Sequence, residues 1–209
     1  GMHRAQRVFI KKVYTGYGQE FDRKRAESEV KIRNELREAG LPVPKTGVWE
    51  IKEGEEKGVY LIMSPFLRGK EKRSKLQPLN PFRAEPTFLE SLNMKSTHDR
   101  KLVTDLAHAT AVMLNHGIVA SFFDFFGVYR RKDGSWHYVI MDTGDLRTAH
   151  SVEEVRHARD EMISEIQRGT GTGWEDVIVR WDGEEPTVFE TFTQELKENL
   201  SRELRKGML

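Results

Sequence analysis

One long helix that ends abruptly near the start of the chain is the feature that most constrains the fold. Residues 22–39 are rich in Glu, Lys, Arg and Ala, which are good helix formers. Gly40 stands where helices often end in a left-handed residue, and Pro42 and Pro44 prevent the helix from continuing. The fold must therefore accommodate a single helix with a fixed end, packed against the segments on either side of it.

Strands are predicted on both sides of this helix. Residues 7–14 alternate in the manner of a strand, and the glycine-rich turn 15–18 follows them. After the helix, residues 46–52 and 58–63 are predicted to form a hairpin around a charged turn. A strand, a helix and a hairpin in this order predict a small antiparallel sheet that carries one helix.

The second half of the chain predicts mainly helices. A helix capped by Ser96 or Thr97 is followed by the unusually apolar segment 118–128 and by a strand over 136–141. Two more helices are expected, one opened by a capping box at Ser151 and one whose apolar stripe runs from Phe189 to Leu204. Together with the first half, this order predicts an α+β fold with two lobes.

The composition changes between the two lobes. Residues 69–95 combine basic residues with several prolines, which is typical of a connecting segment. We therefore predict an N-terminal sheet-and-helix region over 1–68, a basic linker over 69–95 and a helical region over 96–209, forming one compact unit overall.

Charge and cysteine content exclude several classes of protein. The chain of 209 residues has 34 Lys and Arg against 33 Asp and Glu, a net charge of +1, and no Cys. A disulfide scaffold, a cysteine-based zinc site and a cysteine nucleophile are thereby excluded. Near-neutral charge does not favour nucleic acid as a partner. No apolar run approaches the ~20 residues of a membrane span, and no signal-peptide core is present, so a cytoplasmic location is expected.

Three features of the sequence fit one functional pattern. The first is a strand lysine, Lys11 or Lys12, followed by Glu29 on the helix, on a face shared with Ile32 and Leu36. A lysine that holds nucleotide phosphates has a flexible stem, and a helix glutamate facing the sheet would fix it by an ion pair.

The other two features are local motifs. The helix ends in Gly-x-Pro-x-Pro over 40–44, and the last hairpin strand runs on through 60–69 to a glycine. Later, Asp142 ends an apolar strand and is followed two residues on by Gly144. A carboxylate anchored at a strand end is the oxygen ligand that Mg²⁺ requires when it bridges phosphates.

In this order the features resemble the protein-kinase-like superfamily, in particular the branch of aminoglycoside phosphotransferases, RIO-type kinases and lipopolysaccharide-core kinases. The resemblance covers roughly residues 8–147. It implies a bilobal kinase-like fold with ATP and Mg²⁺ as cofactors. In it Lys12 or Lys11 and Glu29 hold nucleotide phosphates, Asp142 binds the metal, and Asp124 is the nearest candidate for the catalytic base.

The chain departs from the family pattern in its catalytic loop. Aligned without gaps, the catalytic aspartate and the metal-binding asparagine fall on Phe122 and Gly127, which can neither accept a proton nor bind a metal. Asp124 would need a shift of two residues to serve as base. Residues 1–7 are also too few for the two strands and glycine-rich turn that cover the phosphates in the family, so the resemblance is to a truncated version.

Two functions follow from these observations. The first is ATP-dependent phosphotransfer to a hydroxyl of a small molecule, a sugar or a protein. The second is a catalytically inactive pseudokinase that serves as a regulatory or binding module, with the aromatic segment 122–126 closing the pocket. The partners expected are a nucleotide and an acceptor or protein partner that the sequence does not identify.

Overall fold

The computed structural model divides the chain into two compact units, Gly1–Lys70 and Glu71–Leu209. The structure describes residues 8–65, 77–78, 88–120, 125–141, 143–170 and 185–208. Most of the predicted linker 69–95 lies outside these residues, so its bounds stay a prediction.

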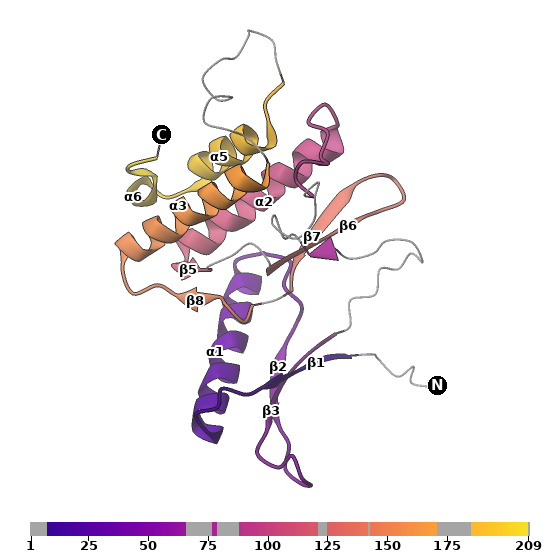
Figure 1. Cartoon of the computed structure of the whole chain (residues 1–209), viewed down its shortest axis with the longest axis vertical. Coiled ribbons are helices and arrows are strands. Elements are labelled where there is room, and N and C mark those ends of the chain that lie inside the picture. The colour runs from indigo at the N-terminus through magenta and orange to yellow at the C-terminus, as the bar shows by residue number, and fades with distance from the viewer. Residues whose placement is uncertain are drawn as a thin grey trace. The chain divides into compact units, whose positions relative to one another are not determined.

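The first unit contains a three-stranded antiparallel sheet and one helix. Its elements are β1 (Val8–Val13), α1 (Gln19–Glu38), β2 (Gly47–Glu50) and β3 (Tyr60–Pro65). The strand order is β1-β3-β2, so β3 lies in the centre, and α1 packs beside the strands (Figure 1). The predicted strand, helix and hairpin of this region are all present.

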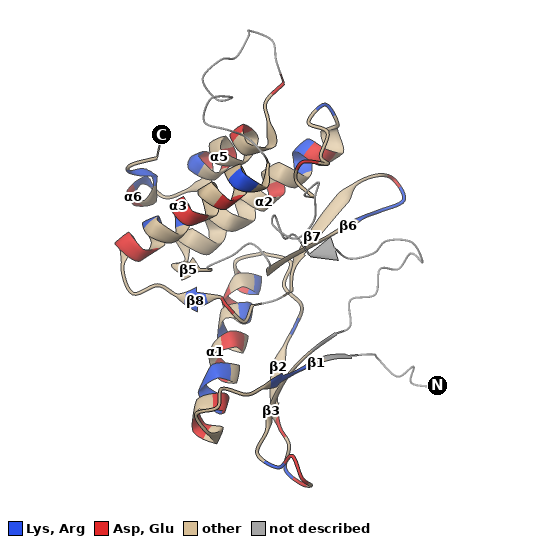
Figure 2. Cartoon of the chain, viewed as in Figure 1, with Lys and Arg blue, Asp and Glu red and all other residues tan. Residues whose placement is uncertain are grey.

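Helix α1 is bounded by glycines at both ends. It begins three residues earlier than predicted, because Gly18, with φ of 99°, turns its carbonyl to accept the amides of Phe21 and Asp22. Gly40 has φ of 88° and follows the last turn, as the sequence predicts. Acidic and basic residues alternate along this helix (Figure 2), and its inward face includes charged residues as well as apolar ones.

The second unit is mainly helical and carries two small antiparallel sheets, in the orders β4-β6-β7 and β5-β8. Its described elements are β4 (Gln77–Pro78), α2 (Thr97–Asn115), β5 (Ile118–Val119), β6 (Phe126–Arg130), β7 (Trp136–Ile140), β8 (Arg147–Thr148), α3 (Val152–Gly169), α5 (Val188–Asn199) and α6 (Arg202–Arg205).

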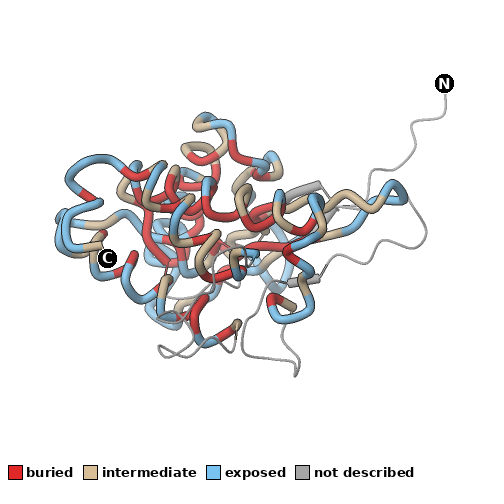
Figure 3. Tube along the Cα trace, turned by 90° about the horizontal axis from the view of Figure 1, so that it is seen from above, coloured by how far each residue is buried: buried red, intermediate tan, exposed pale blue. Residues whose placement is uncertain are grey.

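An apolar core holds the second unit together. Helices α2 and α5 pack against each other, and the largest fully buried side chains include Leu106, Met113, Phe125, Phe126 and Phe192. Buried and exposed residues alternate along the helices (Figure 3), so each helix turns one face inward.

The helix caps of the second unit differ in part from the prediction. Ser96 caps α2 by accepting the amide of Asp99, as expected. Ser151 caps α3, but the side chain of Glu154 accepts from the amide of His150, so the predicted capping box is only half formed. The reciprocal box instead opens α5, between Thr187 and Glu190.

The last predicted helix is two helices. Leu200 has an extended conformation, with ψ of 149°, and it ends α5 before Ser201 begins α6. Leu196, Leu200 and Leu204 are all buried and are spaced four residues apart. One continuous helix would give the same pattern, so the pattern did not reveal the break.

These elements confirm the α+β fold class: a small antiparallel sheet with one helix, then a mainly helical second unit. Among the described residues, no helix combines the length and apolar character that crossing a membrane requires.

Candidate functional site

Strand β1 presents its two lysines on opposite faces of the sheet. Lys11 and Val13 lie on the face covered by α1, where Val13 belongs to the core cluster with Ala26. Lys12 lies on the other face with Ile10, which is half exposed. The two lysines that the sequence could not separate therefore have different surroundings.

Lys11 forms an ion pair with Glu29 of α1. The distance between Lys11 Nζ and Glu29 Oε2 is 3.0 Å, and the glutamate side chain is only 4% exposed while the lysine side chain is 34% exposed. The helix brings Glu29 inward because it lies one turn from Ala26 and Ile32, which are both buried. The carboxylate is thus fixed inside the unit while the ammonium reaches its surface.

Arg33 binds the second oxygen of the same carboxylate. Its Nη2 lies 3.1 Å from Glu29 Oε1, and its Nη1 donates to Thr46 Oγ1 at 3.3 Å. Thr46 in turn donates to the carbonyl of Pro44 at 2.8 Å. The arginine is as buried as the glutamate, at 4% exposure. We call Lys11, Glu29, Arg33 and Thr46 the β1–α1 network.

Lys12 makes a different kind of contact. Its ammonium pairs with Glu56, and both side chains are more than half exposed. Such solvated pairs contribute little to stability or to positioning. Geometry therefore selects Lys11, and not Lys12, as the lysine that α1 holds.

The turn between β1 and α1 is also fixed by a carboxylate. The backbone amide and hydroxyl of Thr15 both donate to Asp22 Oδ1, each at 2.6 Å, and Asp22 is buried. The sequence predicts a flexible turn over 15–18. In the structure, these hydrogen bonds connect this turn to the first turn of α1 and so fix the end of β1 relative to the start of the helix.

The two predicted carboxylates of the second unit, Asp124 and Asp142, lie outside the described residues, as does Phe122. Ile140, which ends β7, and Thr143 are both buried, and Met141, directly before position 142, is half-buried. The roles of base for Asp124 and of metal ligand for Asp142 stay predictions.

Part of the aromatic segment 122–126 belongs to the core of the second unit. Phe125 and Phe126 are buried with their ring centroids 4.4 Å apart, and Phe126 meets the Tyr138 ring edge to face at 5.7 Å. Gly127 lies in β6 opposite Val139. These two Phe side chains are therefore part of the apolar core of this unit.

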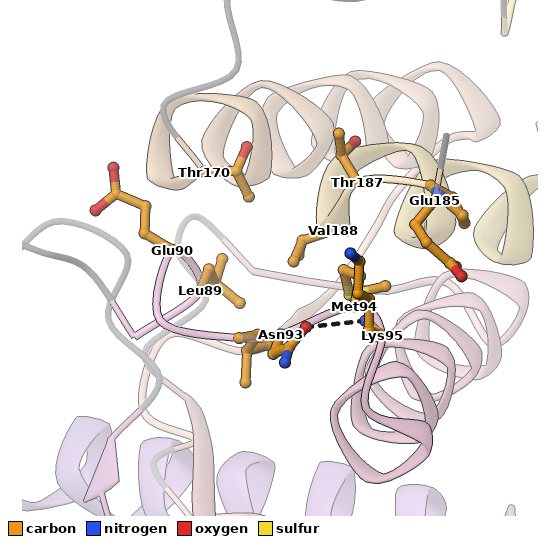
Figure 4. Close-up of a pocket in the computed structure, with 11 residues that line it drawn as sticks. Leu89, Glu90, Asn93, Met94, Lys95, Thr170, Glu185, Thr187 and Val188 are labelled. Carbon is orange, nitrogen blue, oxygen red and sulfur yellow. Dashed lines mark hydrogen bonds between the residues drawn. The ribbon is translucent and has the colours of Figure 1, made fainter. Parts of the chain in front are cut away.

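A cavity of about 360 Å³ lies in the second unit, between the segment before α2 and the start of α5 (Figure 4). Its rim carries charged Glu90, Lys95 and Glu185, and Asn93 Oδ1 accepts the Lys95 amide at 3.0 Å. None of the predicted site residues that the structure describes lines it. No motif in the sequence pointed to this cavity.

Two of the solved structures that are similar to this chain are a bacterial kinase and a bacterial synthetase. No protein-family model matches the chain, and no curated protein matches it either. A proinflammatory kinase, CtkA, from Helicobacter pylori superposes with a TM-score of 0.46 at 10% identity, covering 98% of this chain and 84% of the kinase. The aerobactin synthetase IucC from Klebsiella pneumoniae superposes with a TM-score of 0.44 at 13% identity, over 95% of this chain and 43% of the synthetase. Both TM-scores are low, so neither likeness assigns the chain to a family.

Proposed function

We propose that the protein is kinase-like and binds ATP through Lys11, which Glu29 holds in place. The observation that carries this proposal is the 3.0 Å ion pair between a strand lysine and a buried helix glutamate. Kinase-like proteins use a strand lysine paired with a helix glutamate to hold nucleotide phosphates. Of the two lysines predicted from the sequence, the geometry supports Lys11.

The burial of Glu29 supports a specific role for this pair. Other ion pairs on α1, such as Arg23–Glu27 and Lys24–Glu20, have both partners more than half exposed. A carboxylate taken out of water costs free energy unless cations and hydrogen bonds compensate it. The chain incurs that cost only at Glu29, among the ion pairs described on this helix.

The remaining machinery is proposed from the resemblance. Asp142 would bind the Mg²⁺ that accompanies the nucleotide, and Mg²⁺ would neutralise phosphate charge there. Asp124 would accept the proton of an acceptor hydroxyl, whose oxygen attacks the terminal phosphorus as the bond to ADP breaks. The acceptor class is a small molecule, a sugar or a protein.

A second candidate function is a pseudokinase that binds a nucleotide or a protein partner without transferring phosphate. The specific observation in its favour is Gly127, which lies inside β6 at the position where the ungapped family alignment expects a metal-binding asparagine. Burial of Phe125 and Phe126 beside it leaves aromatic packing where catalytic polar groups would otherwise lie.

Binding of Mg²⁺-ATP, measured by calorimetry, tests the shared part of both candidates. We expect wild type to bind and Lys11→Met to bind at least about tenfold more weakly, because one charged contact to phosphate is lost. Lys12→Met is the matched control, since it removes a neighbouring lysine on the opposite face, and it should bind as wild type. Absence of binding at millimolar ATP would refute nucleotide binding, and equal losses in both variants would refute the choice of Lys11.

Product formation separates the two candidates. With hydroxyl acceptors of the three classes, an active kinase should release ADP in proportion to phosphorylated product, and Asp124→Asn should stop this without weakening ATP binding. Nucleotide binding that requires Asp142 but never yields product, in wild type as in Asp124→Asn, would favour the pseudokinase.

A further inference from the structure

We infer that Arg33 is a positioning residue, which holds the Glu29 carboxylate so that Lys11 is presented to the phosphates. This inference rests on the proposed function and deepens it. The resemblance explains a strand lysine and a helix glutamate, but it gives no role to a buried arginine one turn further along α1.

Each carboxylate oxygen of Glu29 contacts a different cation. Oε1 of Glu29 receives Arg33 Nη2 at 3.1 Å, and Oε2 receives Lys11 Nζ at 3.0 Å. With one oxygen held by a planar guanidinium, the carboxylate cannot rotate without breaking that charged hydrogen bond. The other oxygen therefore points at Lys11 in a fixed direction.

Arg33 is itself fixed from outside the helix. Its Nη1 donates to Thr46 Oγ1 at 3.3 Å, and Thr46 donates to the carbonyl of Pro44 at 2.8 Å. Residues 44 and 46 belong to the connection between α1 and β2, and proline restricts that backbone. The network thus joins β1, α1 and the entry to β2, and it locates the carboxylate relative to the sheet as well as to the helix.

Helix stability alone does not explain this arrangement. Arg23 and Glu27 form an exposed pair at the same i, i+4 spacing on the same helix, and such a pair supports a helix without burial. In many proteins, replacing a buried ion pair by apolar side chains of similar volume is neutral or stabilising. A buried Arg33 that contacts both the glutamate and Thr46 is accounted for by the fixed direction it gives to Glu29.

The test is a double-mutant cycle on the affinity for Mg²⁺-ATP, with Arg33→Met and Lys11→Met alone and together. We expect Arg33→Met to weaken binding about tenfold in the wild-type background and to have no further effect when Lys11 is already Met. Arg23→Gln, the exposed arginine of the same helix, is the matched control and should leave affinity unchanged.

Each outcome of the cycle has one meaning. If wild type does not bind, the proposed function fails and this inference fails with it. If wild type binds and Arg33→Met binds equally well, only the inference on Arg33 fails. An equal loss in both Lys11 backgrounds would show that Arg33 acts through general structure, and it would also overturn the inference.

A milder variant covers the case in which Arg33→Met does not fold. Thr46→Val keeps every charge of the network and removes only the hydroxyl that receives Arg33 Nη1. We expect it to weaken binding by about threefold, and only when Lys11 is present. Unchanged affinity in Thr46→Val, with Arg33→Met unfolded, would overturn the inference.

Discussion

Helices α1 and α2 have nearly the same length but bury different kinds of side chain. Of the six buried residues of α1, three are charged, namely Asp22, Glu29 and Arg33. Of the ten buried residues of α2, only Asp99 is charged. Apolar burial is the main favourable term in folding, whereas buried charges break even only when each is well paired.

The two units therefore differ in the interactions that stabilise them. The second unit surrounds α2 with large apolar side chains, so we expect its stability to depend on packing. Among the described residues, the first unit buries fewer apolar side chains than the second, including Ile32, Leu36 and Ile62, and it adds buried charged residues to them. Substitutions in the two units should therefore lower the free energy of unfolding for different reasons: loss of apolar packing in the second unit, and loss of charge pairing in the first.

The largest effect is expected from a cavity in the second unit. Phe126→Ala removes a fully buried ring that contacts Phe125 and Tyr138, and it should lower the free energy of unfolding by about 4 kcal/mol. Urea unfolding followed by circular dichroism measures this loss. Phe21→Ala, an exposed phenylalanine on α1, is the control and should cost under about 0.5 kcal/mol. Similar losses in both variants would contradict the comparison.

The next effect comes from breaking the ion pairs of the first unit. Glu29→Gln leaves the buried guanidinium of Arg33 without a carboxylate partner from position 29, and we expect a loss of about 3 kcal/mol. Glu27→Gln, which breaks an exposed pair on the same helix, should change little. The free energy of unfolding from urea titration measures both.

Replacing both buried charges should destabilise the unit less than breaking the pair between them. The double variant Glu29→Leu with Arg33→Leu should lose less stability than Glu29→Gln alone, because no buried charge is left uncompensated at those positions. It should still bind Mg²⁺-ATP more weakly than wild type. A double variant that is less stable than Glu29→Gln would mean that the ion pairs themselves stabilise the unit.

A smaller effect is expected at the start of α5. Thr187→Ala removes the hydroxyl that accepts the Glu190 amide but keeps the backbone amide that donates to the Glu190 carboxylate, and it should lower the stability of the second unit by about 1 kcal/mol. Ser201→Ala is the matched control, because Ser201 precedes α6 without a side-chain cap bond. Thermal unfolding distinguishes them if only the first variant melts earlier.

The last effect appears only at alkaline pH. Burial raises the pKa of Tyr138 from its ordinary value of 10 to about 12. From about pH 10 to pH 12 the unfolded chain therefore loses this proton before the folded chain does, and stability falls as the pH rises. Tyr138→Phe should remove that part of the decline, measured as the shift in melting temperature between pH 9 and pH 11. An unchanged decline would show that Tyr138 does not contribute.

Much of the first unit could be predicted from local sequence signals. Gly40 and the prolines after it place the end of α1, and helical spacing places Glu29 on the buried face with Ile32 and Leu36. Strand alternation separates the faces of Lys11 and Lys12, but it does not say which face a helix covers. Which face α1 covers depends on tertiary packing, and it is known only from the structure.

Other features escaped prediction for similar reasons. Arg33 lies in a highly charged helix, where an arginine is usually solvated, and its signal was only the i, i+4 spacing from Glu29. The break between α5 and α6 left no mark because buried leucines continue across it. Roles for Asp124 and Asp142 stay predictions that the binding and activity experiments test.

The strand order of the first sheet has a consequence for the way this unit folds. Strands β2 and β3 are neighbours along the chain, whereas β1 pairs with β3 across about fifty residues. Local contacts form faster than distant ones, so the hairpin and α1 are expected to form early and β1 to dock last. Lys11 would then meet Glu29 only in the final step. An intermediate that accumulates before that step would contain a folded α1 whose Glu29 is not yet paired with Lys11.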